Sequence, residues 1–542
     1  MKTKNAKKTN KQPLTPKQKQ ISVLLERAMK HHNQGQLTQA ENLYNAILEI
    51  DENNVDANHL LGVKHIQTRH FEKALHYLKK AIAIQPNNAL PHYNLGLAYQ
   101  HMYACDKAAS SYENAIRCKP DHIESILNAG SMYMYLQDRY NAEKKFRRAV
   151  HLAPNRLDAN NNLGLCLFEQ HQNKDARTYF IKAIEIAPNN PEGHNNLASL
   201  EQSEGNILEA MEAYKKAITL NPSYYTAINN LAFTHERHLE LDKAKKLYEE
   251  ASTSPEHAVI SNTTLATYCW IDNDIAACEK YLETTIDYST KPYSPKQNKF
   301  IVGYSQFLLA LIENYKLAPI PYLETDAALA PISIAGDSHS LTYANLTIQI
   351  ENELYRGAPK LMTGCKAWHL ANEAENEYKF QFKKLITKQA ENSTLLVSLG
   401  EIDCRSDEGI LVAFKKSAKN KNLSINFKDS KTLAALTNQI RDLTEQYCKY
   451  VSEACATKNI QAYLFNVPAP LKANLDEQAL YELQVLIASY NQSLSESATG
   501  FKNISIIDLY SVTNDLNGFS SGKYHIDQVH LSPAICGKIF GR

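Results

Sequence analysis

The feature that most constrains this chain is a 34-residue period that runs through its first half. When the sequence is divided into blocks of 34 from residue 21, a small residue recurs at one position and a large apolar or aromatic residue follows four positions later. The small residues are Ala40, Ala74, Ala108, Ala142, Ala176, Ala210 and Ala244. The large residues are Tyr44, Leu78, Tyr112, Phe146, Phe180, Tyr214 and Tyr248. A fixed period of this length indicates stacked repeats that share one continuous core.

Each block predicts two amphipathic helices, and a proline ends the second helix in most blocks. These prolines are Pro86, Pro120, Pro154, Pro188 and Pro222. The blocks resemble tetratricopeptide repeats, with seven clear copies and a degraded eighth that begins near Val259. The resemblance implies a right-handed superhelical solenoid over residues 21–290, with a concave groove that binds a protein or peptide partner.

One asparagine per block occupies the sixth position of five successive blocks. These residues are Asn94, Asn128, Asn162, Asn196 and Asn230. In tetratricopeptide proteins this position faces the groove, where side-chain amides can donate to and accept from an extended peptide backbone. Two interpretations stand, a ladder that binds peptides and a consensus residue without a binding role.

Composition agrees with a largely helical protein and excludes several functional classes. Glycine accounts for only 18 of 542 residues, and the formal net charge is +1, which gives no basic surplus for a nucleic-acid binder. The ten cysteines form no CxxC pair, and no paired metal spacing of histidines occurs, so we expect neither a disulfide scaffold nor a metal site. We expect a cytoplasmic protein without a membrane span, in which residues 1–20 form a disordered basic tail.

The second half changes character after a connector over residues 291–329, which includes a packing helix over Phe300–Tyr315. Short β-rich runs then alternate with helical stretches such as Lys431–Glu453 and Glu477–Ser493. The predicted strands are Ile332–Ala335, Leu395–Ser398, Ala462–Phe465 and Ile504–Ile507. Residues 330–542 therefore predict an α/β domain with a mostly parallel sheet, in which functional residues gather at the carboxyl ends of the strands.

Polar clusters in this half supply the parts of an acyl-transfer site. The first predicted strand runs into Gly336-Asp337-Ser338-His339, which would expose a serine nucleophile on a tight turn. Only four histidines lie in this half of the chain, namely His339, His369, His525 and His530. Asp527 stands three residues before His530, so that one helical turn would bring its carboxylate to the imidazole. Elimination therefore favours Ser338, His530 and Asp527 as the catalytic residues.

These motifs resemble those of the SGNH (GDSL-type) hydrolases over residues 330–542. The resemblance implies a three-layer, flavodoxin-like α/β fold and an oxyanion hole formed by the backbone N–H groups of Ser338 and Gly364, with Gly357 as the alternative glycine. The family's third oxyanion donor is an asparagine in a Gly-x-Asn-Asp block. Here Ile402 stands in its place, and losing one such donor typically costs about 3–4 kcal/mol in the transition state.

Further polar residues near the predicted strand ends allow several roles. Glu401, Asp403 and Arg405 would either shape a polar substrate pocket or form an ion pair that braces the loop. Asn466 is a second candidate for the missing oxyanion donor.

The sequence as a whole predicts an esterase-type serine hydrolase without a cofactor, in which the repeats recruit a protein partner. Its substrate would be a small-molecule, lipid or glycan ester. Two alternatives remain, a tetratricopeptide adaptor whose second domain is catalytically degenerate, and an O-acyltransferase that acts on a glycan.

Overall fold

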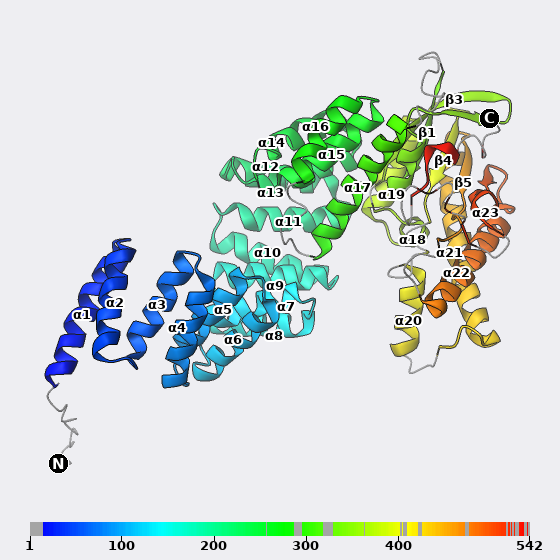
Figure 1. Cartoon of the computed structure of the whole chain (residues 1–542). Helices are drawn as coiled ribbons and strands as arrows, with labels where there is room; N and C mark the ends of the chain where they lie inside the picture. The colour runs from blue at the N-terminus through cyan, green and yellow to red at the C-terminus, as the bar shows by residue number, and fades with distance from the viewer. Residues whose placement is uncertain are drawn as a thin grey trace, which may run out of the picture. The chain divides into compact units, whose positions relative to one another are not determined.

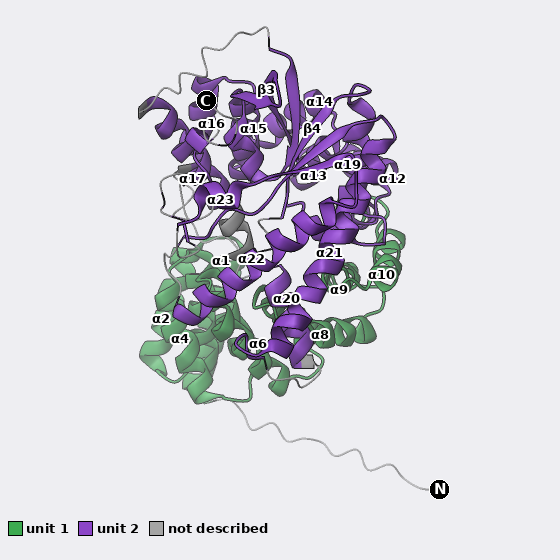
Figure 2. Cartoon of the chain, turned by 90° about the vertical axis from the view of Figure 1, so that its right-hand side faces the viewer, with its two compact units in different colours: residues 1–196 green, residues 197–542 purple. Residues whose placement is uncertain are grey.

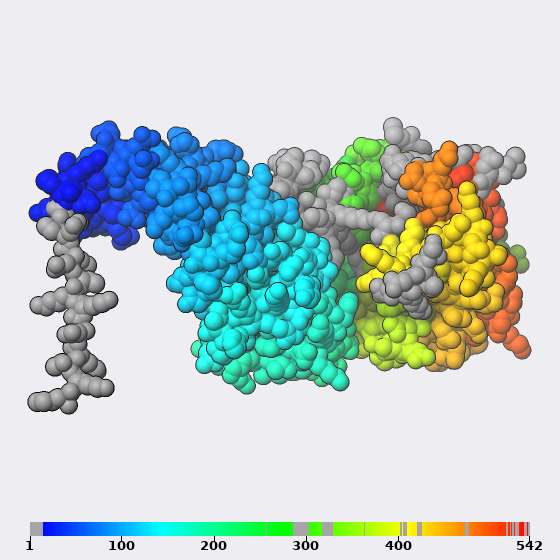
Figure 3. All heavy atoms as spheres, turned by 90° about the horizontal axis from the view of Figure 1, so that it is seen from below, coloured from blue at the N-terminus to red at the C-terminus, as the bar shows by residue number. Residues whose placement is uncertain are grey.

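The computed structural model divides the chain into two compact units, residues 1–196 and 197–542 (Figure 2). The structure describes residues 15–255, 257–286, 295–317, 329–362, 364–400, 404, 409–420, 425–471, 476–515, 519–520, 522, 525, 530–535 and 539. Residues outside these ranges are grey in the space-filling view (Figure 3).

Sixteen helices form the repeats, as the 34-residue period predicts, and they are labelled in Figure 1. Within 1–196 they are α1 (Pro16–Asn33), α2 (Leu37–Ile50), α3 (Val55–Gln67), α4 (Phe71–Ile84), α5 (Ala89–His101), α6 (Cys105–Cys118), α7 (Ile123–Tyr135), α8 (Arg139–Leu152), α9 (Leu157–Glu169), α10 (Asn173–Ile186) and the start of α11 (Pro191–Ser203). The rest are α12 (Ile207–Leu220), α13 (Tyr225–Arg237), α14 (Leu241–Ala251), α15 (Ala258–Ile271) and α16 (Ile275–Ile286). A further helix, α17 (Pro295–Leu317), packs against α15 and α16.

The close approach of paired helices explains the glycines of the repeats. A Cβ atom added at Gly96, Gly130 or Gly164 would lie 2.5 Å from the ring of Tyr112, Phe146 or Phe180 respectively. Each of these rings is fully buried in its repeat. The glycine therefore makes room for the aromatic side chain sixteen residues further on, which is how a short sequence pattern sets the packing of a helix pair.

Each helix pair is joined by one residue in the left-handed backbone region. These residues recur every 34 positions, at Gly35, Arg69, Tyr103, Gln137, His171, Gly205, Leu239 and Asn273. This conformation costs roughly 1–2 kcal/mol for a residue with a side chain. Only two of the eight positions hold glycine, so most of these turns are retained against a local conformational preference.

The α/β region contains one six-stranded sheet in the order β2-β3-β1-β4-β5-β6. Its elements are β1 (Pro331–Gly336), η1 (Ser338–Tyr343), β2 (Thr347–Ile350), β3 (Glu353–Leu361), α18 (Ala367–Ala371), α19 (Glu377–Lys388), β4 (Thr394–Ser398), α20 (Ile410–Asn420), α21 (Ser430–Ala456), β5 (Gln461–Phe465), α22 (Glu477–Ala498), β6 (Ile504–Ile507), α23 (Leu509–Thr513) and η3 (Pro533–Ile535). Every strand pair except β2–β3 is parallel, which confirms the mostly parallel sheet.

The four predicted strands correspond to β1, β4, β5 and β6, and the two predicted helices to α21 and α22. Strands β2 and β3 were not predicted. β3 holds Gly357 and Pro359 and has no β-branched residue, which removes the usual signal of a strand. Gly357 is required there because a Cβ atom would lie 2.0 Å from the Tyr343 carbonyl oxygen at the end of η1.

The last repeats and the α/β region pack together within unit 197–542. The Arg237 guanidinium of α13 is buried, donates to Gln381 Oε1 of α19 at 3.1 Å and lies 4.4 Å from the Tyr378 ring centroid. Trp270 at the end of α15 donates from Nε1 to the Leu341 carbonyl oxygen of η1 at 3.1 Å. These contacts fix the final repeat helices against the segment that follows β1.

Candidate active site

The candidate site lies at the carboxyl end of β1, where the chain changes direction across the sheet. After β1 the chain passes to β3 on one side and then to β4 on the other, so that Gly336 pairs with Leu361 of β3 and with Ser398 of β4. A reversal of this kind leaves a crevice between the two crossovers. Ser338, the first residue of η1, stands two residues beyond β1 at this point.

The structure brings two of the predicted catalytic residues together across 192 positions of sequence. Ser338 Oγ lies 3.0 Å from His530 Nε2, which is hydrogen-bonding distance for a nucleophile and its base. The two residues are only 6% and 8% exposed. The third predicted residue, Asp527, lies outside the described residues, so its role stays a prediction.

A second acid–histidine pair borders this site. Asp337 Oδ1 accepts from the backbone N–H of His339 at 3.0 Å and lies 2.9 Å from His339 Nδ1. The His339 ring stacks on the His530 ring at 4.7 Å between centroids. Sequence reasoning did not assign a role to this pair, although an acid and a histidine flank the serine directly. The pair holds one side of the His530 ring.

A second ring contact of His530 comes from α17. The Phe307 ring stacks on the His530 imidazole at 3.8 Å between centroids and 16° between planes, and Phe307 is only 1% exposed. The packing helix was predicted, but an aromatic residue in an apolar helix carries no signal for such a partner. Helix α17 therefore covers the candidate base and restricts the movement of its ring.

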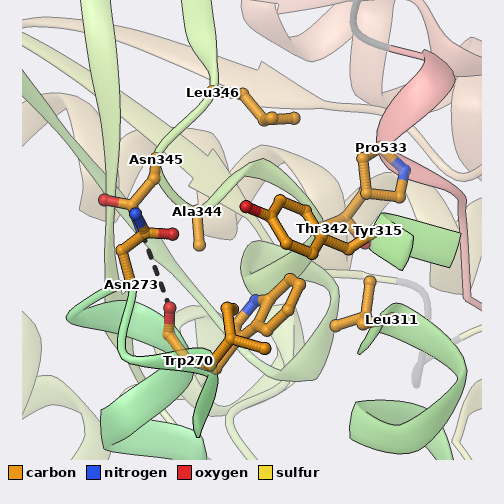
Figure 4. Close-up of a pocket in the computed structure, with 10 residues that line it drawn as sticks. Trp270, Asn273, Leu311, Tyr315, Thr342, Ala344, Asn345, Leu346 and Pro533 are labelled. Carbon is orange, nitrogen blue, oxygen red and sulfur yellow. Dashed lines mark hydrogen bonds between the residues drawn. The ribbon is translucent and has the colours of Figure 1, made fainter. Parts of the chain in front are cut away.

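Hydrogen bonds attach the serine-bearing segment to its surroundings. Thr342 Oγ1 donates to the Leu531 carbonyl oxygen at 2.9 Å, which joins η1 to the residue after His530. Asn345 Nδ2 donates to the Ile271 carbonyl oxygen at 3.0 Å and lies 3.5 Å from that of Trp270 (Figure 4). These bonds hold the residues after Ser338 against both α15 and the His530 segment.

The predicted oxyanion glycines lie in different settings. Gly364 follows β3 with φ +73°, a conformation that favours glycine, and Met362 two residues earlier donates its N–H to the Gly336 carbonyl oxygen at 2.6 Å. This contact keeps the Gly364 loop beside the end of β1. The alternative, Gly357, lies within β3, and its N–H donates to the Leu346 carbonyl oxygen at 2.8 Å. Gly357 is therefore engaged in the strand.

Close to Gly364, the pKa of His369 is lowered to about 4, because burial disfavours its charged form and Lys366 and Arg237 repel the proton. Its Nδ1 accepts the backbone N–H of Lys366 at 2.9 Å, a bond that needs the neutral imidazole. His369 therefore serves the fold of the α18 segment in its neutral state.

Asn466 follows β5, and its amide is bonded to the start of α23. Nδ2 donates to Asp508 Oδ1 at 2.7 Å, while Oδ1 accepts the N–H groups of Leu509 and Tyr510 at 2.7 and 3.0 Å. Asn466 therefore joins the end of β5 to the start of α23, and its predicted role as an oxyanion donor stays a prediction. The residues Glu401, Ile402, Asp403 and Arg405 lie outside the described residues.

The asparagines of the repeats make contacts inside the solenoid. Asn94 Nδ2 lies 2.7 Å from His59 Nε2 of the preceding block, and Asn196 accepts from Asn195 Nδ2 at 3.3 Å. Asn162 is half-buried. Asn230 lies beside a cavity in unit 197–542. Peptide binding by the five residues stays a prediction.

The described part of the chain lacks two kinds of feature. No cluster of three histidine, cysteine, aspartate or glutamate residues with metal-binding geometry occurs there. No helix among the same residues has the length and apolarity needed to cross a membrane.

Comparison with known families identifies the repeats. Models described as TPR repeat and tetratricopeptide repeat match residues 70–102, 127–191 and 191–224. The chain therefore contains tetratricopeptide repeats, and repeats of this class suggest protein or peptide binding. No family match identifies the α/β region. Among curated proteins, none matches the chain.

Several solved structures resemble the repeats. YrrB, described as a TPR protein with an unusual peptide-binding site, is 21% identical, with 34% of this chain and 96% of that chain covered and a TM-score of 0.31. PilF of Pseudomonas aeruginosa is 17% identical, with 40% and 100% covered and a TM-score of 0.36. A tetratricopeptide repeat protein of Parabacteroides merdae is 18% identical, with 43% and 93% covered and a TM-score of 0.39.

Proposed function

We propose that the α/β region is an SGNH-type ester hydrolase. The observation that carries the proposal is the 3.0 Å contact between Ser338 Oγ and His530 Nε2 at the switch point of the sheet. The five parallel strands lie in the order β3-β1-β4-β5-β6. Numbered along the chain, this is the doubly wound order 2-1-3-4-5, which agrees with the flavodoxin-like fold that the motifs imply.

In the proposed reaction Ser338 Oγ attacks the ester carbonyl carbon while His530 Nε2 takes the hydroxyl proton. The tetrahedral oxyanion accepts from the N–H groups of Ser338 and Gly364. As the C–O bond to the alcohol breaks, His530 returns the proton to the leaving alcohol. Water, activated by His530, then hydrolyses the acyl-enzyme and releases the carboxylic acid and the free serine. Asp527 orients the imidazole.

A fluorophosphonate probe tests this proposal directly, because it forms a stable bond only with an activated serine. We expect the full chain to be labelled at Ser338 and to release acid from short-chain aryl esters, and we expect Ser338→Ala to lose both properties. Ser340→Ala is the matched control, because Ser340 lies in the same turn and donates to the Asp337 carbonyl oxygen. Absence of labelling in the folded wild-type chain would refute the hydrolase.

A catalytically degenerate adaptor is the second candidate function. Ile402 in place of the family asparagine and the burial of Ser338 favour it. This function predicts that Asn128→Ala with Asn162→Ala weakens partner binding, whereas Ser338→Ala leaves it unchanged. An acyltransferase would form the same acyl-enzyme, so product analysis with an acetylated glycan separates transfer to a sugar hydroxyl from hydrolysis.

A further inference from the structure

A cavity of about 330 Å³ lies inside unit 197–542, between the last repeat helices and the end of β3. Its walls come from α13, α14, α15 and α17 and from Leu361 and Gly364. Asn230 and Thr264 line it from the sixth position of successive 34-residue blocks, the position predicted to face the groove. The volume falls within the range of small-molecule sites, which is roughly 300–1,000 Å³.

The cavity shares its walls with the candidate active site. Leu361 pairs with Gly336, two residues before Ser338, and Gly364 is the predicted oxyanion donor. Tyr304 lines the cavity one helical turn before Phe307, the residue that stacks on His530. Tyr304 and Leu361 also pack against the apolar cluster that contains Phe307. A molecule in this cavity would therefore lie next to the proposed oxyanion hole.

Each of the three threonine hydroxyl groups in the α15 wall donates its proton to a backbone carbonyl oxygen of the same helix. Thr263 Oγ1 donates to the Val259 carbonyl oxygen at 2.8 Å, and Thr264 Oγ1 donates to that of Ile260 at 3.1 Å. Thr267 Oγ1 donates to the Thr263 carbonyl oxygen at 2.9 Å. Because a hydroxyl group has one proton and two lone pairs, each of these oxygens can only accept a further hydrogen bond.

On the opposite wall, the Tyr248–Glu236 pair adds acceptor oxygens, and the Asn229 and Asn230 amides can both donate and accept. Tyr248 donates its hydroxyl proton to Glu236 Oε2 at 2.9 Å, and the Glu236 side chain is buried. Burial raises the pKa of Glu236, whereas the neighbouring Arg237 acts in the opposite direction. A ligand with only acceptor atoms, such as a carboxylate or phosphate, could use the amide donors but would leave the threonine oxygens and Glu236 without a donor. The Arg237 guanidinium already supplies a positive charge beside Glu236, so Glu236 does not need a cationic ligand to balance its charge. The walls therefore favour a neutral ligand that brings hydrogen-bond donors.

We propose that this cavity binds the alcohol portion of the ester substrate, and that this portion is a neutral, hydroxyl-bearing group such as a sugar or polyol. The proposal rests on the proposed ester hydrolysis. An ordinary acyl chain has no donors to offer, whereas the hydroxyl groups of a sugar would supply donors for the threonine oxygens and for Glu236. The repeats then select the substrate as well as a protein partner.

Two primary acetates on six-membered rings, one bearing hydroxyl groups and the other a plain hydrocarbon ring, test the proposal. The full chain is assayed for acetate release from methyl 6-O-acetylglucoside and from cyclohexylmethyl acetate. We expect kcat/KM to favour the glucoside by at least about tenfold, and we expect Thr264→Val and Thr267→Val each to reduce this preference by about fivefold, the effect of one ordinary hydrogen bond. Thr285→Val is the matched control, because Thr285 is a buried threonine of α16 that donates to the Leu282 carbonyl oxygen.

A second measurement separates the cavity from the chemistry. Binding of methyl glucoside to the Ser338→Ala chain is followed by ligand-observed NMR, with Thr264→Val as the comparison. If the glucoside binds and the binding depends on Thr264 while no serine labelling occurs, the hydrolase is wrong and the cavity stands as a sugar site. If labelling occurs without a preference between the two acetates, or with a preference for acetylcholine over both, the cavity assignment is overturned and the hydrolase stands.

Discussion

The repeats of residues 15–196 are stabilised by contacts between residues close in sequence, whereas the α/β region depends on contacts between residues far apart in sequence. In the repeats, a glycine and the ring that fills its space stand sixteen residues apart, as Gly130 and Phe146 do. In the α/β region, the decisive contacts join η1 to the His530 segment, with Ser338–His530 and Thr342–Leu531 separated by 192 and 189 residues. Damage to one repeat should therefore remain local, whereas the candidate site depends on every crossover between β1 and His530.

The largest expected effect belongs to the long-range contact. We predict that His530→Gln lowers kcat for ester hydrolysis by roughly 10⁴-fold, because the serine loses its base. His525→Gln is the control, since His525 lies in the same C-terminal segment and contacts Ser520 Oγ at 3.0 Å. We expect less than a threefold change in that variant. Equal losses in both variants, measured at matched folded fractions, would contradict the role of His530.

The same substitution in each region gives the next test. Phe146 and Phe307 are both 1% exposed, and truncating either to alanine should destabilise its unit by about 3–5 kcal/mol in urea unfolding. Only Phe307→Ala should also lower kcat, by roughly tenfold, because the His530 ring loses its stacking partner and its fixed orientation. An equal fall in kcat for Phe146→Ala would show that the two regions are coupled.

This difference in range explains what the sequence could predict. The repeats follow from residues within one block, so a helix pair was predicted for every block. Helix α1, however, begins at Pro16, inside the tail of residues 1–20 that was predicted to be disordered, because Thr15 caps the helix and Pro16 suits its first turn. Ser338 and His530 were predicted as partners from motif order and residue elimination. The Asp337–His339 pair and the Phe307 stack depend on ring orientations across three elements. No periodic pattern records such orientations, which is why sequence reasoning missed these contacts.

Acid should weaken the α/β region through His369. Its pKa is about 4 in the folded chain, against an ordinary value near 6.5, so the unfolded state binds more protons between these two values. The free energy of unfolding should fall as the pH is lowered from 6.5 to 4, by at most about 3 kcal/mol, and should show no further loss from this group below pH 4. His369→Gln should flatten the profile in chemical denaturation. An unchanged slope would assign the acid sensitivity to other groups.

The smallest expected effect is the change in stability when glycine replaces either of two residues with positive φ, Tyr103 or Asn345, which differ in their hydrogen bonding. Tyr103 has φ +58° in a repeat turn and is largely exposed, so Tyr103→Gly should relieve backbone strain and stabilise its unit by about 1 kcal/mol. Asn345 has φ +59° after η1, but its amide donates to the Ile271 carbonyl oxygen. Asn345→Gly gains less backbone relief, because asparagine tolerates the left-handed region, and it loses this hydrogen bond, so its net change should be near zero or unfavourable. Thermal unfolding of both variants tests this expectation, and equal stabilisation would show that the Asn345 bond contributes little to holding η1 against α15.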